Sequence, residues 1–167
     1  MSLTASLRVK FEAAQVGAAD FGGPESNPIL ERLLKFASGG GADQADQVWS
    51  DRRTLAASTP EDLDLAGGLT DAFGNVITMA EVVALGVFAS EDNTNDVVVG
   101  DAAAPVPVFA GTNPTFSVKP GGCIVVAAPK AAGLFTVGAG STDDLKIANS
   151  GAGTSVTYDI FVLGRSA

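Results

Sequence analysis

Few side chains in this sequence of 167 residues have the chemistry of an active site. The chain contains no histidine, so it can form neither a Ser–His–Asp or Cys–His site nor an imidazole metal site. Its one cysteine, Cys123, stands in an apolar run and is expected to be a small buried side chain. No GxxxxGKS/T phosphate loop is present. We therefore expect neither enzyme activity nor a bound cofactor.

Acidic side chains are the remaining candidates for catalysis or metal binding. Asp62 with Asp64, or Asp143 with Asp144, could form the carboxylate pair of a glycoside hydrolase. Exposed acids are, however, common in a chain of net charge −9. The loop 91–96 (EDNTND) offers oxygen ligands for a hard cation, but it lacks the EF-hand spacing, and Asn and Asp usually bond their own turn. We assign no metal site, and the sequence leaves cation binding by this loop open.

The single tryptophan and the single tyrosine, Trp49 and Tyr158, allow two interpretations. On a lectin-like sandwich they would be platforms on which sugar rings stack. Single aromatic residues of this kind are more often anchors of a core or of an interface. Trp49 is accordingly also a candidate for contact with a protein partner.

Composition and charge narrow the possible partners. The chain has 10 Lys and Arg against 19 Asp and Glu, which argues against binding to nucleic acid or to an anionic membrane. Charged residues make up only 17% of the chain, compared with about a quarter in typical soluble domains. A surface this poor in charge indicates either a large partner interface or simply an alanine-rich composition. The N-terminus has no apolar run long enough for a signal peptide or a membrane span.

The region from Met79 to Val126 predicts the centre of the fold. It contains three apolar runs bounded by turn residues, as expected for strands: 82–88, 97–99 and 123–126. The Asx-rich segment 91–96 is expected to be the loop of a hairpin between the first two runs. Pro120-Gly121 predicts a tight turn before the third run, because proline pre-sets φ and glycine accepts a positive φ.

Two further segments predict strands by their alternation. From Leu3 to Phe11, apolar and polar side chains alternate as on a strand with one wet face, with a helix as the competing interpretation. The segment 155–164 is the clearest strand signal, with one apolar face: Val156, Tyr158, Ile160 and Val162. Short strands that recur at roughly ten-residue spacing predict an all-β fold. We expect an antiparallel β-sandwich of jelly-roll type.

Residues 18–28 form a linker, in which Gly22-Gly23-Pro24 stops any regular element. We therefore divide the chain into an N-terminal extended arm with its linker, residues 1–28, and a β-sandwich domain, residues 29–167. The segment 29–36 is expected to be either one short helix, capped by Asn27 and starting at Pro28, or a strand.

The segment from Val48 to Leu163 resembles a group of tailed-bacteriophage virion proteins. Four stretches carry the resemblance: GGGADQADQVWSDRRTLAASTPEDLDLAGGLTDAFG, DNTNDVVVG, VKPGGCIVVAAP and LKIANSGAGTSVTYDIFVLG. The segment as a whole covers about two thirds of the chain, and the four stretches contain no catalytic signature. The resemblance implies a virion component of the jelly-roll capsid decoration, or cement, type.

The resemblance also implies a partner and a location. Decoration proteins sit as small oligomers over capsomer junctions and clamp neighbouring shell subunits. The expected partner is the major capsid protein, the expected state is a homo-oligomer (a trimer rather than a dimer), and the expected location is the capsid surface of the virion, after synthesis in the host cytoplasm.

The alternating N-terminal segment suits an arm that adds a strand to a neighbour's sheet. With Trp49, it supplies the candidate partner-binding residues: Leu3, Leu7, Val9 and Phe11. An ordinary first strand of the sandwich is the alternative for this segment. The competing hypotheses for the whole protein are a tail or fibre module and a carbohydrate-binding module for host attachment.

Overall fold

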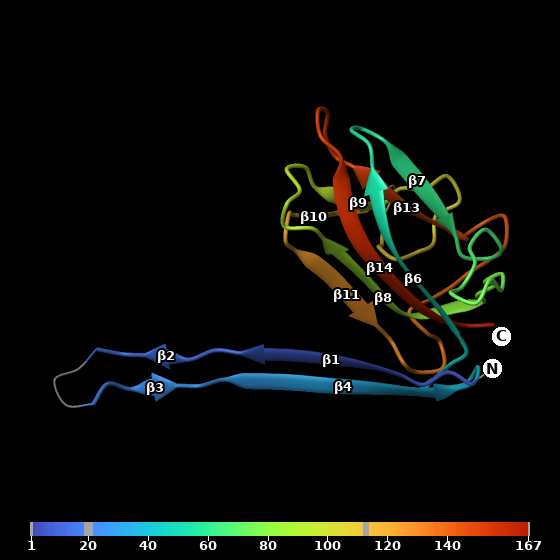
Figure 1. The fold of residues 1–167 in the computed structure, drawn as a ribbon. Helices are drawn as coiled ribbons and strands as arrows, with labels where there is room; N and C mark the ends of the chain where they lie inside the picture. The colour runs from blue at the N-terminus through green and yellow to red at the C-terminus, as the bar shows by residue number, and fades with distance from the viewer. Residues whose placement is uncertain (1, 19–21, 112–113, 167) are drawn as a thin grey trace.

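The computed structural model describes residues 2–18, 22–111 and 114–166. In these ranges the chain is all-β: a body of packed antiparallel sheets, and a long hairpin that projects from it (Figure 1). The described residues contain no helix, and therefore none long and apolar enough to cross a membrane. Both ends of the chain lie at the end of the body where the hairpin begins (Figure 1).

The body has two layers. The first layer, the large sheet, has the strand order β11 (Cys123–Ala127), β8 (Glu81–Ala89), β14 (Val156–Arg165), β6 (Gln47–Leu55), and the short β12 (Phe135–Thr136) also pairs with β8. The second layer, the small sheet, has the order β10 (Thr115–Val118), β9 (Val97–Gly100), β13 (Asp144–Asn149), β7 (Pro60–Asp64). Neighbouring strands in both sheets are antiparallel.

The core lies between the two sheets because alternate side chains of each strand point inward. Val156, Tyr158 and Val162 of β14 are fully buried, and so is Ile147 of β13. Fully burying an aliphatic side chain contributes about 1.5–3 kcal/mol. A slip of one residue would turn all the inward side chains outward, so the apolar pattern also sets the strand register.

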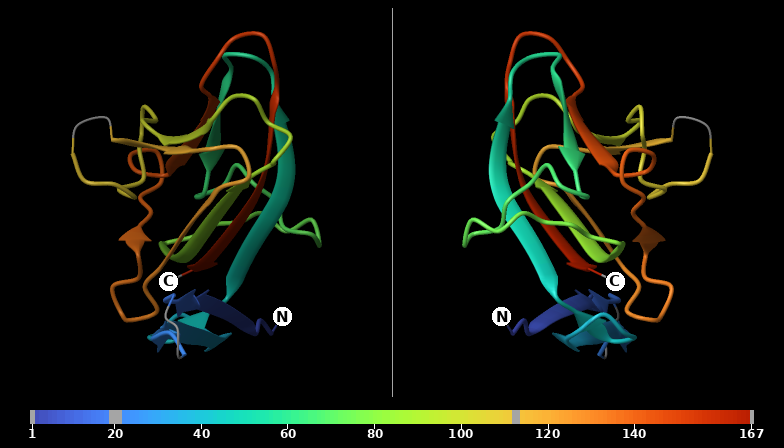
Figure 2. Two further views of the ribbon diagram at one scale, coloured as in Figure 1. Left: turned by 90° about the vertical axis from the view of Figure 1, so that its left-hand side faces the viewer. Right: turned by 90° about the vertical axis from the view of Figure 1, so that its right-hand side faces the viewer.

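The projecting hairpin, called the arm below, consists of the described residues up to Ser38. Its main strands β1 (Ala5–Glu12) and β4 (Ile29–Ser38) are antiparallel, and β2 (Gln15–Val16) pairs with β3 (Glu25–Ser26) nearer the tip. At the base of the arm, a short parallel pairing joins β4 to β5 (Gln44–Ala45). Figure 2 shows the arm end-on, beneath the body.

The short helix considered for residues 29–36 is wrong, because this segment belongs to strand β4. Its apolar residues fit helical spacing, but its backbone pairs with β1, from Ile29 opposite Glu12 to Phe36 opposite Ala5. Asn27 donates its side-chain amide to Glu25 Oε1 at 3.0 Å instead of capping a helix. A partner distant in sequence therefore decides the conformation.

The hairpin predicted around residues 91–96 is also wrong. The flanking strands β8 and β9 lie in different sheets, so this segment crosses from the large sheet to the small sheet. The three apolar runs themselves form strands β8, β9 and β11, as predicted.

The tight turn predicted at Pro120-Gly121 is confirmed. Gly121 has a φ of 71°, and the N–H of Gly122 donates to the Lys119 carbonyl at 2.8 Å. The strands predicted at 3–11 and 155–164 are confirmed as β1 and β14.

Candidate functional site

The arm has one mostly apolar face, which its strand register creates. Residues directly opposite each other on β1 and β4 share a face, and side chains alternate between the two faces. The apolar arm face carries Ala5, Leu7, Val9 and Phe11 from β1 and Leu30, Arg32, Leu34 and Phe36 from β4. Leu3 continues this pattern toward the N-terminus. Arg32, opposite Val9, is the one charged residue on this face.

The inner half of the apolar arm face packs on the body. Phe36 is 2% exposed and belongs to a second hydrophobic cluster with residues of the large sheet. Those sheet residues are Val83, Ala84 and Leu163, and Leu3, Ala5 and Leu34 of the arm pack against them. The cluster fixes the base of the arm to the body.

The outer half of the apolar arm face extends beyond the body (Figure 1). Phe11 is 65% exposed and Leu30, directly opposite on β4, is 68% exposed. Closer to the tip, Val16 is 71% exposed, although its pairing with Glu25 places it on the other face of the arm. An isolated two-stranded hairpin is marginally stable in water and normally needs a further layer. The outer arm is therefore a strong candidate for contact with another polypeptide.

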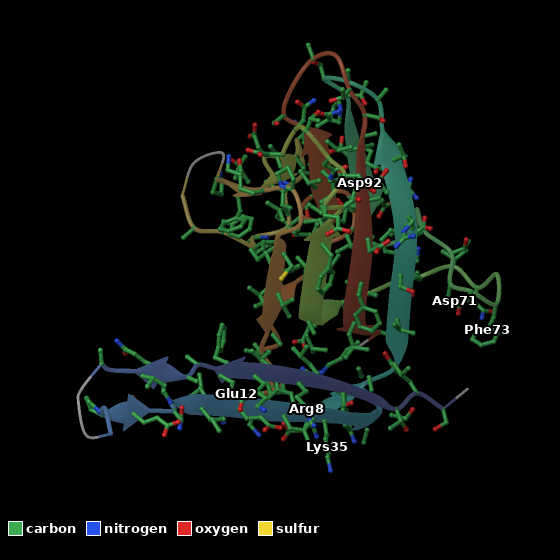
Figure 3. All side chains as sticks on the ribbon, turned by 60° about the vertical axis from the view of Figure 1, so that its left-hand side comes forward. Arg8, Glu12, Lys35, Asp71, Phe73 and Asp92 are labelled. Carbon is green, nitrogen blue, oxygen red and sulfur yellow. The ribbon has the colours of Figure 1, made fainter. Side chains whose placement is uncertain are left out.

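The other face of the arm carries most of its charged residues. Arg8 pairs with Glu31 at 3.3 Å and Lys10 with Glu12 at 2.5 Å. Lys35 points away from the body in Figure 3. Because these side chains are exposed, each ion pair contributes at most about 1 kcal/mol.

The large sheet turns a second apolar surface toward the arm. On its outer face, which is the face away from the small sheet, Val125, Gly86 and Phe161 stand side by side on β11, β8 and β14. Phe161 is 40% exposed and Phe88 is 43% exposed. The ring of Phe88 lies so close to Gly86 that an added Cβ would come within 2.9 Å of it.

The two apolar surfaces meet in a pocket of about 310 Å³, called the apolar corner below. Ala5, Leu7 and Phe36 line it from the arm, while Phe88, Val125 and Phe161 line it from the sheet. Figure 3 shows the arm crossing below the lower ends of the strands of the large sheet. Both sides of the corner are continuous with exposed apolar side chains.

Cys123 lies on the same outer face and is exposed, so the expectation that it is buried is wrong. It pairs with Phe88 across the β11–β8 ladder, and β11 forms one edge of the large sheet. An apolar run on an edge strand has one face in the core and leaves the other face to solvent.

The predicted partner-binding residues have four different environments. Leu3 packs at the base of the arm and Leu7 lines the apolar corner. Val9 is half-buried and Phe11 is exposed farther out along the arm. Trp49 is 5% exposed and lies in the core between the sheets, so its ring is not accessible to a partner. The strand alternation thus located one side of the apolar corner, whereas Leu30, Phe88 and Phe161 were missed.

Tyr158 is fully buried, so neither aromatic residue considered as a sugar platform presents a ring face to solvent. The Tyr158 hydroxyl donates to Glu61 Oε1 at 2.5 Å. Arg53 also bonds Glu61, with its Nε 2.7 Å from Oε2. Burial, followed by the hydrogen bond to Glu61, raises the pKa of Tyr158 well above its usual value. These three side chains link β6, β7 and β14 across the core.

The two predicted acid pairs come together at one end of the small sheet. Asp144 on β13 lies directly opposite Asp64 on β7. Burial, followed by the negative charges of Asp143, Asp62 and Asp64, raises the pKa of Asp144. Asp64 accepts the N–H of Ala66 at 2.8 Å, and Asp143 accepts the N–H of Gly140, so these two carboxylates brace turns.

The acidic loop 91–96 also uses its side chains for internal bonds. Asn93 exchanges two hydrogen bonds with the Thr157 backbone, at 2.8 and 2.9 Å. Asp96 pairs with Lys119 at 2.6 Å. Within residues 2–18, 22–111 and 114–166, no cluster of three His, Cys, Asp or Glu side chains is arranged to hold a metal ion.

Comparison of the chain with protein-family models, with curated proteins and with solved structures gives no match. Function must therefore be inferred from the surfaces just described. The arm and the outer face of the large sheet both carry exposed apolar side chains, and they meet at the apolar corner.

Proposed function

We propose that this protein is a bacteriophage capsid decoration protein. It binds the outer surface of the shell and stabilises the head by clamping neighbouring major capsid subunits. The observation that carries the proposal is the arm: a rigid β body sends out a hairpin whose outer half is covered by no other described part of the chain. Such a shape bridges neighbours and needs no reaction centre.

We also propose that the body is a jelly roll. Its eight longer strands, β6 to β11 with β13 and β14, can be numbered one to eight along the chain. The large sheet then has the order 1-8-3-6 and the small sheet the order 2-7-4-5. This interleaving, in which successive strands alternate between the sheets except for the fourth and fifth, is typical of the double Greek key found in viral capsid domains. It agrees with the resemblance of residues 48–163 to phage virion proteins.

The charge distribution supports a role for the arm in adhesion. Residues 1–38 contain four basic and four acidic residues, so the body carries the whole net charge of −9. Like-charged bodies repel one another, whereas a neutral arm approaches other proteins without that cost. The acidic body would be attracted to basic patches of a shell surface, and such complementarity speeds the encounter.

The free edge of β1 is the part of the arm that we expect to bind the shell. No described strand pairs with β1 on the side away from β4. The N–H of Ala13 donates to Pro28 at 3.2 Å and that of Gly17 to Pro24 at 2.8 Å, so odd-numbered residues face β4. In an antiparallel pair the bonding direction alternates, and the N–H groups of even residues such as Arg8 point outward. These groups can extend a neighbour's sheet.

Replacing Arg8 by proline tests this assignment. Proline removes one outward N–H and is tolerated on edge strands, so the hairpin should persist. Loss of one hydrogen bond costs about 1 kcal/mol and weakens binding up to about tenfold. The measurement is binding of the purified protein to expanded, undecorated heads of the phage that encodes it, followed by the temperature at which the heads break.

Arg8→Ala is the matched control, because it removes the same side chain and keeps the N–H. It should bind within about twofold of the original protein, since exposed ion pairs contribute little. Equal binding by both variants would contradict the edge assignment. Failure of the unmodified protein to bind heads, or its location on the tail in a particle reconstruction, would contradict the decoration function.

A further inference from the structure

We propose that the apolar corner receives the arm of a second copy of this chain. The outer half of one copy's apolar arm face lies against the outer face of the next copy's large sheet. Leu30 and Phe11 of one chain then cover Phe161 and Phe88 of the other. This association does not depend on a capsid role, because it joins two surfaces of the isolated protein.

The packing of the arm within one chain is the first argument for this occupant. The inner half of the apolar arm face already packs on the outer face of the large sheet, where Leu34 and Phe36 meet Ala84 and Leu163. The same two surfaces continue outward, on the arm to Leu30 and on the sheet to Phe161. A second arm would therefore repeat a contact that the fold has already formed.

Exposure is the second argument. Phe11 and Leu30 are 65% and 68% exposed, and Phe88 and Phe161 are 43% and 40% exposed. Burying a large apolar side chain is worth about 1.5–3 kcal/mol. Contact between arm and sheet would bury both sets of side chains. It would also cover the two-stranded arm with the further layer that it lacks.

Charge is the third argument, because it selects which surfaces meet. Two bodies that each carry nine net negative charges repel each other, but the arm has equal numbers of basic and acidic residues. The only charged residue on the apolar arm face is basic, Arg32. The outer sheet face carries Asp159 on β14, which is 45% exposed at its side chain and bonded to Arg52. An arriving arm thus brings a positive charge to an acidic body.

The arm and the sheet are different patches, so each copy both gives an arm and receives one. Such a contact closes into a small ring of two or three copies when the rotation between copies permits. The single cysteine provides a built-in probe, because Cys123 lies on the outer sheet face that the second arm would cover.

Complementation between two variants tests the proposal. Leu30→Asp disables the arm and keeps the sheet face, whereas Phe161→Asp disables the sheet face and keeps the arm. In sedimentation velocity, we expect the original protein to form an oligomer and each variant alone to be a monomer. A one-to-one mixture of the variants should restore association, because the intact arm of one fits the intact face of the other.

Matched controls separate this contact from a general effect of added charge. Ile29→Asp places the charge on the other arm face, at a residue that is 60% exposed. Phe116→Asp places it on the small sheet, at a residue that is 44% exposed. Both controls should remain oligomeric. Cys123 should also react with a maleimide at least about threefold faster in Leu30→Asp than in the original protein, and this readout holds even where Phe161→Asp fails to fold.

Several results would overturn the proposal. One is a monomeric original protein at all accessible concentrations, and another is oligomers that persist in Leu30→Asp. Monomeric variants that do not associate when mixed would instead indicate arm-to-arm or sheet-to-sheet contact. Because no shells are present in any of these measurements, their failure leaves the decoration function to be judged by the head-binding assay.

Discussion

Replacing Arg165 by alanine should lower the free energy of unfolding by about 3 kcal/mol, since removing one partner of a buried ion pair strands the groups it served. The Arg165 side chain is fully buried. Its guanidinium donates to Glu81 Oε2 at 2.7 Å and to the carbonyl oxygens of Pro129 at 2.9 Å and of Gln44 and Lys130 at 3.1 Å. Alanine would leave these acceptors without their donor, and the carboxylate of Glu81 is only 21% exposed.

The position of Arg165 makes the effect spread to the arm. Gln44 lies in β5, at the base of the arm, while Glu81 begins β8 and Lys130 follows β11. The one guanidinium therefore joins three segments where the arm meets the body. We expect Arg165→Ala to speed amide hydrogen exchange in the base of the arm as well as to shift the urea midpoint.

Arg52→Ala is the control for this prediction. Arg52 also makes two hydrogen bonds to a carboxylate, with Asp159, but its side chain is 75% exposed. An ion pair this exposed is screened by solvent and contributes little, so this variant should unfold close to the original protein. Equal losses of unfolding free energy in the two variants would show that the contribution of Arg165 to stability does not depend on its burial.

Local patterns in the sequence were enough to predict the strands with clear alternation. In β14, the inward residues Val156, Tyr158, Ile160 and Val162 are all in the core, as their spacing indicates. Period-two alternation reports a physical condition, one dry face and one wet face, that the strand meets wherever it sits in the sheet. For the same reason the first strand was found from residues 3–11 alone.

Pairing between distant strands could not be predicted in the same way. Residues 29–36 satisfy both helical and strand spacing, and only the presence of β1 opposite them decides for the strand. The loop 91–96 has turn residues that suit a hairpin, but its flanking strands find partners in different sheets. Nothing within either segment carries this information.

The candidate site shows the same limit. Alternation along β1 identified Leu7, but the sheet residues that face it come from β8, β11 and β14, far along the chain. A signal did exist in β14, where Phe161 and Leu163 appear on the otherwise polar side of the strand. These two apolar residues indicated that the outer side of the strand is also covered, but not which segment covers it.

Tyr158 should make the protein sensitive to alkaline pH. Its pKa is raised in the folded state by burial and by the hydrogen bond to Glu61. The unfolded chain then loses the phenol proton at about pH 10, while the folded chain keeps it. The stabilisation is complete below pH 10 and is lost as pH rises above it, by up to about 1.4 kcal/mol per pH unit.

Tyr158→Phe isolates this contribution. At neutral pH the variant should be about 1–2 kcal/mol less stable, because Glu61 Oε1 loses its donor in a partly buried site. Because the variant has no phenol, its stability does not fall above pH 10 through tyrosine ionisation. Effects of lysine deprotonation are common to both proteins. The curves of unfolding free energy against pH for the two proteins should therefore converge and meet at about pH 11.

Urea unfolding between pH 7 and 11.5 measures both curves, and absorbance near 295 nm follows the phenolate directly, because Tyr158 is the only tyrosine in the chain. In the folded protein this absorbance should stay flat through pH 10 and rise only together with the loss of the circular dichroism signal of the strands. A phenolate that forms near pH 10 while the strands remain intact would mean that water reaches the Tyr158 hydroxyl. The link that Glu61 makes across the core would then be too weak to hold β7 against β14.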